Sequence, residues 1–218
     1  MDTRDERRLL ESGLDVLGLA PADGEIDRLL GHLALIRKWS GAYNLVAPGE
    51  LEHLVTRHTL DSLGILPHVG PGPLLDVGTG AGFPGMPLAI ARPGQDHWLV
   101  DSAGKKIRFL ANAARELGLD NVHATHGRVE RFSPAVEFST ITSRAFSSLT
   151  LFAETVRHLA GPATRLLAMK GRLDPAELDA LPDWARLDGD PIRLLVPGLG
   201  AERHLVIMRL APPDNDND

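Results

Sequence analysis

From residue 74 onward, short apolar runs alternate with longer stretches of helical periodicity, and this alternation constrains the fold more than any other feature. The stretch 104–117 repeats its apolar residues at helical spacing and is followed by Gly118, a residue type that commonly ends helices. Strands that alternate with helices form a parallel sheet covered by helices on both faces. The sequence predicts strands at 74–77, 97–101, 121–125, 138–142 and 165–169.

Both ends of the chain depart from this alternation. The first seventy residues have helical periodicity, and a PGP segment at 71–73 marks a boundary. Near the other end, the apolar runs 194–196 and 204–210 are separated by PGLGAER, which predicts an antiparallel hairpin. We therefore predict an N-terminal helical extension (1–70), an α/β domain (71–211) and a disordered acidic tail (212–218).

Composition and charge exclude several classes of protein. The chain has no cysteine, which excludes disulfide scaffolds, thiolate zinc sites and cysteine nucleophiles. Its start, MDTRDERRLL, lacks the apolar core of a signal peptide, and no apolar run approaches the ~20 residues of a membrane helix. The net charge of −6 is concentrated in residues 1–30 and in DNDND, so the body between them is nearly neutral and has room for a local basic face. We expect a cytoplasmic protein with no membrane association.

A glycine-rich loop, GTGAGFPG, follows the first predicted strand. It matches the dinucleotide fingerprint G-x-G-x-x-G, with Asp101 at the end of the next strand. Two residues oppose a bound diphosphate, because Pro84 has no N–H to donate and Asp76 adds a negative charge. The same residues also match D-x-G-x-G-x-G. This pattern suits S-adenosylmethionine, whose sulfonium and ammonium groups favour a nearby carboxylate.

S-adenosylmethionine is therefore the expected cofactor. Gly78 and Gly80 would allow positive φ angles and a close backbone approach, and Asp101 would accept hydrogen bonds from the ribose hydroxyls. A parallel sheet that ends in an antiparallel hairpin also suits this cofactor better than a dinucleotide. The predicted fold is α/β, with the Rossmann-like parallel sheet of class I S-adenosylmethionine-dependent methyltransferases.

The residues also limit the acceptor chemistry. The cysteine nucleophile of pyrimidine C5 enzymes and the D/N-P-P-Y/F tetrad that grips an exocyclic amine are both missing. An acceptor with a free lone pair, such as guanine N7, needs placement and exclusion of water rather than a base, so no catalytic residue is assigned. The segment after the fourth strand is TSRAF. Because an arginine bound to N7 itself would block attack, we assign Arg144 to cofactor or phosphate contact.

Seven sequence blocks carry a family resemblance, in the order KWSGAYNL, TRHTLDSL, DVGTGAGFPG, LVDSAGKKIRFL, ITSRAFSSL, AMKG and ERHLVIM. Over roughly residues 30–210 the chain resembles the bacterial 16S ribosomal RNA guanine-N7 methyltransferases, also called glucose-inhibited division protein B. The resemblance implies a class I fold, S-adenosylmethionine as the donor, and a guanine of 16S ribosomal RNA, free or in a 30S precursor, as the acceptor. We expect a monomer. The matching blocks imply cofactor contacts at Gly78, Phe83, Asp101, Val129, Glu130 and Arg144.

Five basic residues are candidates for RNA contact: Arg57, His58, Lys105, Lys170 and Arg203. For Arg57, a surface ion pair with Asp61 one helical turn later is an equal alternative. Lys170 ends a strand on the ligand side of a parallel sheet, which favours phosphate contact. Lys105 opens a helix, where a solvated position is the commoner outcome, and Arg203 is compatible with a structural or an RNA-facing role.

Other functions stay open from the residues alone. A small-molecule methyltransferase would use the same loop, and an NAD-dependent oxidoreductase would use the dinucleotide match that Pro84 and Asp76 oppose. A non-catalytic RNA-binding protein would retain the glycine-rich loop without binding a cofactor. No metal site is expected, because His123 and His126 would point to opposite faces of one strand.

Overall fold

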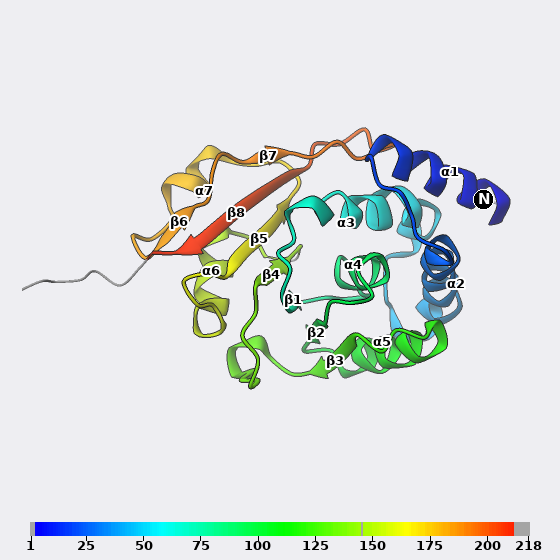
Figure 1. The fold of residues 1–218 in the computed structure, drawn as a ribbon, viewed down its shortest axis with the longest axis horizontal. Coiled ribbons are helices and arrows are strands. Elements are labelled where there is room, and N and C mark those ends of the chain that lie inside the picture. Colours follow the sequence, from blue (N-terminus) through cyan, green and yellow to red (C-terminus); the bar gives the residue numbers. More distant parts are fainter. Residues whose placement is uncertain (1–2, 145, 212–218) are drawn as a thin grey trace, which may run out of the picture.

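A computed structural model describes residues 3–144 and 146–211, and its centre is one eight-stranded sheet. The order across the sheet is β3-β2-β1-β4-β5-β8-β6, and β7 also pairs with β8 (Figure 1). The strands are β1 (Leu74–Val77), β2 (His97–Asp101), β3 (Val122–His126), β4 (Thr140–Ser143), β5 (Arg165–Lys170), β6 (Ala185–Leu187), β7 (Ile192–Arg193) and β8 (His204–Leu210).

The predicted parallel sheet is confirmed. Strands β1 to β5 all pair in parallel, with β1 between β2 and β4. The first two strands have the predicted bounds, and the next three differ from the prediction by at most two residues at either end. Because parallel strands place their carboxyl ends at one edge of the sheet, the loops after β1, β2, β4 and β5 all lie at that edge.

The antiparallel end of the sheet is confirmed in β8 and corrected in its hairpin partner. Strand β8 occupies 204–210 as predicted and runs antiparallel to β5. It pairs in the hairpin with Ile192 and Arg193 rather than with 194–196, where Leu195 is 71% exposed. Strand β6 was not predicted, because only its first residue, Ala185, is buried and so no apolar run marks it.

Helices cover both faces of the sheet, since side chains of a strand alternate between its faces. Leu74 packs in a cluster with Leu88 of the α4 side, whereas Leu75 packs with Phe152 on the α6 side. The helices are α1 (Thr3–Val16), α2 (Glu25–Tyr43), α3 (Asp61–Leu63), α4 (Gly85–Ala91), α5 (Gly104–Leu117), α6 (Leu149–Val156) and α7 (Pro175–Asp179). The 3-10 helices are η1 (Pro48–His53), η3 (Leu66–His68), η4 (Val129–Arg131) and η5 (Arg157–Leu159), and η2 (Leu54–Leu60) is a π-helix.

The predicted N-terminal helices pack on the α4 and α5 side of the sheet (Figure 1). Buried residues of α1, α2 and η2 form one apolar cluster with those of α4 and α5, for example Leu33 with Leu110. The segment 54–60 is a π-helix rather than the α-helix that the periodicity predicts. The domain boundary at residue 71 stays a prediction, and the predicted disordered tail at 212–218 lies outside the described residues. No helix within the described ranges is long and apolar enough to cross a membrane.

Candidate active site

Asp76 is hydrogen-bonded to the glycine-rich loop that follows β1. Its side chain is fully buried at the end of β1, and its Oδ2 accepts hydrogen bonds from Thr79 Oγ1 at 2.6 Å and from the Gly85 backbone N–H at 2.9 Å. The second oxygen, Oδ1, has no hydrogen-bond partner among the described residues. The carboxylate that the sequence assigns to a cationic cofactor therefore also joins both ends of the loop.

Burial raises the pKa of Asp76 to about 6, although both hydrogen-bond donors act in the opposite direction. A raised pKa means that the folded protein binds this proton more tightly than the unfolded chain does. The stability that the group contributes is present below its ordinary pKa of about 3.9, and it is lost as the pH rises through 6.

We expect Asp76→Asn to remove this pH dependence, because the amide oxygen can accept the same two hydrogen bonds without a buried charge. Relative to the wild type, the free energy of unfolding of Asp76→Asn should rise by roughly 2 kcal/mol between pH 4.5 and pH 7.5. Urea unfolding at the two pH values measures it. The exposed Asp120→Asn is the matched control. If the free energy of unfolding of Asp76→Asn differs from that of the wild type by the same amount at both pH values, the pKa of Asp76 is not raised by folding.

The loop and β2 meet at Asp101. Gly78 and Gly80 have φ angles of +68° and +61°, the left-handed conformation that the sequence predicts for them. The Gly80 N–H donates to Asp101 Oδ2 at 2.9 Å, and the Ala103 N–H donates to Oδ1 at 2.8 Å. Each carboxylate oxygen therefore keeps acceptor capacity for a ligand, and Lys106 Nζ lies 3.7 Å from Oδ2.

A cavity of about 350 Å³, the loop cavity, lies at the carboxyl ends of β1 and β2. Four residues that the sequence assigns to the cofactor line it: Gly78, Asp101, Val129 and Glu130. Gly80 contacts Asp101 but does not line the cavity, and Phe83 and Arg144 lie elsewhere. The tertiary structure thus brings most of the predicted set together.

Phe83 lies inside the protein rather than on the wall of the loop cavity. Its ring is 3% exposed and packs between two histidines, with ring centroids 5.1 Å from His32 and 4.9 Å from His58. The guanidinium carbon of Arg144 lies 5.5 Å from the ring centroid. Phe83 therefore connects the glycine loop to the residues of a second cavity.

The second cavity has a volume of about 730 Å³ and is called here the basic cavity. Arg144 lines it together with four of the five candidates for RNA contact: Arg57, His58, Lys170 and Arg203. Lys105 is exposed at the start of α5 and lines neither cavity.

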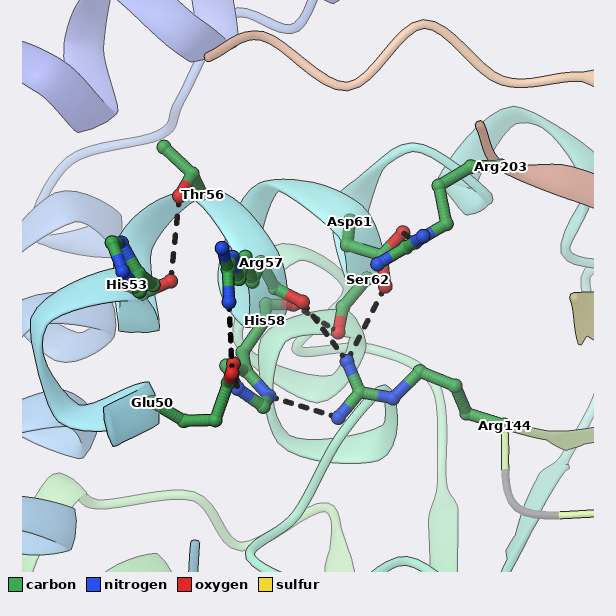
Figure 2. Close-up of polar contacts among 9 residues, drawn as sticks. All are labelled: Glu50, His53, Thr56, Arg57, His58, Asp61, Ser62, Arg144 and Arg203. Atoms are coloured by element: carbon green, nitrogen blue, oxygen red, sulfur yellow. Dashed lines mark hydrogen bonds and ion pairs between the residues drawn. The ribbon is translucent and has the colours of Figure 1, made fainter. Parts of the chain in front are cut away.

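Arg144, which directly follows β4, contacts both η2 and α3 in this cavity (Figure 2). One terminal nitrogen donates to the Arg57 carbonyl at 3.2 Å and to Asp61 Oδ2 at 3.3 Å. The other donates to His58 Nδ1 at 2.9 Å. Asp61 is 1% exposed and also lies 3.2 Å from Arg203 Nε, so one buried carboxylate joins both arginines. Burial raises the pKa of Asp61, and the arginines act against this shift.

His58 is held as a neutral ring. Burial lowers its pKa to about 4, and the positive charge of Arg144 acts in the same direction. With Nδ1 accepting from Arg144, the proton resides on Nε2, which lies 3.2 Å from Glu50 Oε2 and donates to it. Arg57 donates to the other oxygen, Oε1, at 2.9 Å.

The structure corrects one interpretation and weakens another. Arg57 pairs with Glu50, so the Arg57–Asp61 ion pair, the alternative to RNA contact, is wrong. The π-helix at 54–60 changes which residues share a face, and Asp61 is directed inward. The Lys170 side chain is 12% exposed, pairs with Glu177 at 2.9 Å and donates to the Ser147 carbonyl. Sequence reasoning assigned Glu50 no role, because no motif spacing distinguishes it from a surface glutamate. Among the described residues, no group of three His, Asp or Glu is arranged to hold a metal.

Comparisons with known proteins identify the family of the chain. The family described as rRNA small subunit methyltransferase G matches residues 25–206. The chain is 48% identical over 208 residues to a ribosomal RNA small subunit methyltransferase G of Pseudomonas paraeruginosa, covering 95% of this chain and 97% of that protein. A protein of the same name from Methylobacillus flagellatus is 45% identical over 199 residues, covering 91% and 96%.

The fold is also that of solved methyltransferases. A SAM-dependent methyltransferase from Aquifex aeolicus superposes with a TM-score of 0.54 at 19% identity, covering 82% of this chain and 98% of that one. The class I S-adenosylmethionine-dependent methyltransferase fold predicted from the sequence is confirmed. The chain belongs to the rRNA small subunit methyltransferase G family.

Proposed function

We propose that this protein transfers a methyl group from S-adenosylmethionine to N7 of one guanine in 16S ribosomal RNA. The observation that carries the proposal is the pair of cavities at one edge of the sheet. Asp101 ends β2 and lines the loop cavity, whereas Lys170 ends β5 and lines the basic cavity. The relatives are named for ribosomal RNA of the small subunit, which agrees with a basic acceptor cavity.

The loop cavity fits S-adenosylmethionine by its donors and acceptors. Its carboxylate, Asp101, has acceptor capacity for ribose hydroxyls, and the left-handed Gly78 lets the backbone approach a ligand. Val129 and Glu130 would contact the adenosine part. When bound, S-adenosylmethionine supplies a methyl group that leaves for an acceptor lone pair, with the electron pair of the S–C bond staying on sulfur and no proton transferred.

The basic cavity would hold the acceptor base and its phosphates. Guanine N7 carries a free lone pair, so the chain has to position the base and exclude water, and none of its side chains needs to act as a base. Arg57 and Arg203 are suited to RNA phosphates, because each guanidinium is partly exposed and permanently charged. We propose that Lys105 extends this contact outside the cavity, that the protein acts as a cytoplasmic monomer, and that its substrate is 16S ribosomal RNA, free or in a 30S subunit precursor.

A transfer assay tests this function. The protein is incubated with methyl-labelled S-adenosylmethionine and with 30S subunits or 16S RNA from a strain that lacks the family enzyme. Label should enter the RNA, and nuclease digestion should release it as 7-methylguanosine. Absence of transfer to both RNAs would reject the proposal. Calorimetric titration with S-adenosylmethionine and with NAD separates the methyltransferase from an oxidoreductase.

A buried histidine of α2 should control the affinity for the cofactor. His32 is fully buried, its Nε2 lies 2.9 Å from the Ala81 carbonyl of the loop, and its ring packs on Phe83. Burial lowers the pKa of His32 to about 4, so the ring is neutral and donates through Nε2. His32→Phe removes this donor and leaves a buried carbonyl unpaired. We expect the Kd for S-adenosylmethionine to rise roughly tenfold, with little change in kcat at saturating cofactor.

Calorimetry and steady-state kinetics measure the two quantities. His32→Gln is the matched variant, because its amide can donate to the same carbonyl, and it should bind S-adenosylmethionine more tightly than His32→Phe. Equal Kd values for His32→Phe and the wild type would show that the loop does not depend on this hydrogen bond.

A further inference from the structure

The basic cavity contains two carboxylates in different environments. Asp61 is 1% exposed and lies between Arg144 and Arg203, so its oxygens face the protein. Glu50, in contrast, lies on η1 with its side chain 33% exposed. Its carboxylate is therefore the acidic group of this cavity that a ligand can reach.

The Glu50 carboxylate is also held in a fixed position. Arg57 donates to Oε1 at 2.9 Å and His58 lies 3.2 Å from Oε2, and Figure 2 shows both side chains directed at the carboxylate. Each oxygen uses one acceptor site for these donors and keeps another. A fixed carboxylate with free acceptor sites is suited to a ligand edge that presents two adjacent N–H donors.

Guanine is the RNA base with such an edge. Its N1–H and one N2–H lie side by side on the Watson–Crick edge, where adenine has an unprotonated N1 that a carboxylate repels. This edge lies across the base from N7, so a carboxylate that binds it leaves N7 free. Methylation at N7 also places positive charge on the base, and a nearby carboxylate stabilises charge that develops in the transition state.

We propose that Glu50 determines the specificity for guanine by accepting hydrogen bonds from N1–H and N2–H of the target base. This inference rests on the proposed function and adds a residue that recognises the acceptor. Arg57 and His58 position the carboxylate, and Met169 and Leu199 of the same cavity provide apolar surface for the faces of the ring. The target nucleotide must turn out of its RNA stack to reach the cavity.

Replacing the target guanosine by inosine tests the contact, because inosine keeps N7 and N1–H but lacks the N2 amine. The methylated position is first mapped with the wild type, and the inosine RNA is then made by splinted ligation. Wild-type enzyme should methylate the guanosine RNA with a kcat/KM roughly tenfold above that for inosine RNA, the value of one hydrogen bond to a charged group. In Glu50→Gln the amide nitrogen opposes the N2 amine, so the ratio should fall to about one or below.

The ratio is measured within one protein sample, so a loss of folded protein cancels from it. Glu50→Ala is a second variant and should also give a ratio near one. Glu52→Gln, an exposed neighbour on η1, should keep the wild-type ratio. Equal rates of the wild type on both RNAs, or an unchanged ratio in Glu50→Gln, would overturn the role of Glu50 and leave the proposed function intact. If the wild type methylates neither the guanosine RNA nor the inosine RNA, the proposed function itself is rejected.

Discussion

Asp101→Ala is expected to weaken the binding of S-adenosylmethionine by at least 100-fold. The substitution removes the proposed acceptor for the ribose hydroxyls, and hydrogen bonds to a charged group each contribute about 1.5–3 kcal/mol. It also leaves the N–H groups of Gly80 and Ala103 without the carboxylate that holds the loop against β2. The loss therefore combines a missing ligand contact with a displaced loop.

Calorimetric titration of folded Asp101→Ala with S-adenosylmethionine measures this effect, and circular dichroism checks that the variant is folded. Asp101→Asn should have a Kd for S-adenosylmethionine between those of the wild type and Asp101→Ala, because its amide keeps one acceptor oxygen but lacks the negative charge. Asp120→Ala removes an exposed carboxylate just after α5 and is the control. A wild-type Kd in Asp101→Ala would place the cofactor outside the loop cavity.

Arg144→Lys is expected to lower kcat/KM for RNA by about 10² to 10³, with little change in the Kd for S-adenosylmethionine. A guanidinium bonds Asp61, His58 and the Arg57 carbonyl at the same time, which one ammonium on a flexible stem cannot reproduce. The basic cavity should lose its arrangement while the loop cavity, which Arg144 does not line, keeps its shape. Steady-state kinetics with RNA and calorimetry with the cofactor measure the two effects.

The same experiment decides between the roles assigned to Arg144. The family resemblance implies a cofactor contact, which predicts a raised Kd for S-adenosylmethionine and an unchanged KM for RNA. The position of Arg144 in the basic cavity predicts the opposite result. Arg165→Lys is a matched control. Arg165 is the first residue of β5, at the opposite end of the strand from the cavities, and it also pairs with a carboxylate, that of Asp188.

Local pattern was sufficient for most of the fold. The strands 74–77 and 97–101 and the helix 104–117 have the predicted bounds, because the two strands are short runs that are buried almost throughout and the helix repeats its buried residues at helical spacing. Pattern failed where that signal is absent or misleading. Strand β6 has one buried residue in three, and the π-helix at 54–60 has apolar residues that the α-helical period fits equally well.

The candidate site likewise has features that local sequence pattern predicted and features that it did not. The glycine spacing and the position of Asp101 after a strand indicated the cofactor loop, because loops at the carboxyl ends of parallel strands share one edge of the sheet. Phe83 and Lys170 show the limit of this reasoning. Phe83 is enclosed between two histidines, His32 and His58, that are distant in the sequence, and Lys170 pairs with Glu177, at a spacing that matches no motif.

The sequence by itself determined the parallel sheet, the glycine loop and the family, since these depend on residue order within short segments. Only the tertiary structure decided the partners of the charged residues. Glu50 is in η1, Asp61 is in α3 and Arg144 directly follows β4, and all three line the basic cavity. Arg144 contacts Asp61 directly and is joined to Glu50 through His58, because the π-helix directs Asp61 inward and sheet pairing places the end of β4 beside it. Buried charges are stable only when paired, so the pairing depends on which segments the core brings together rather than on spacing along the chain.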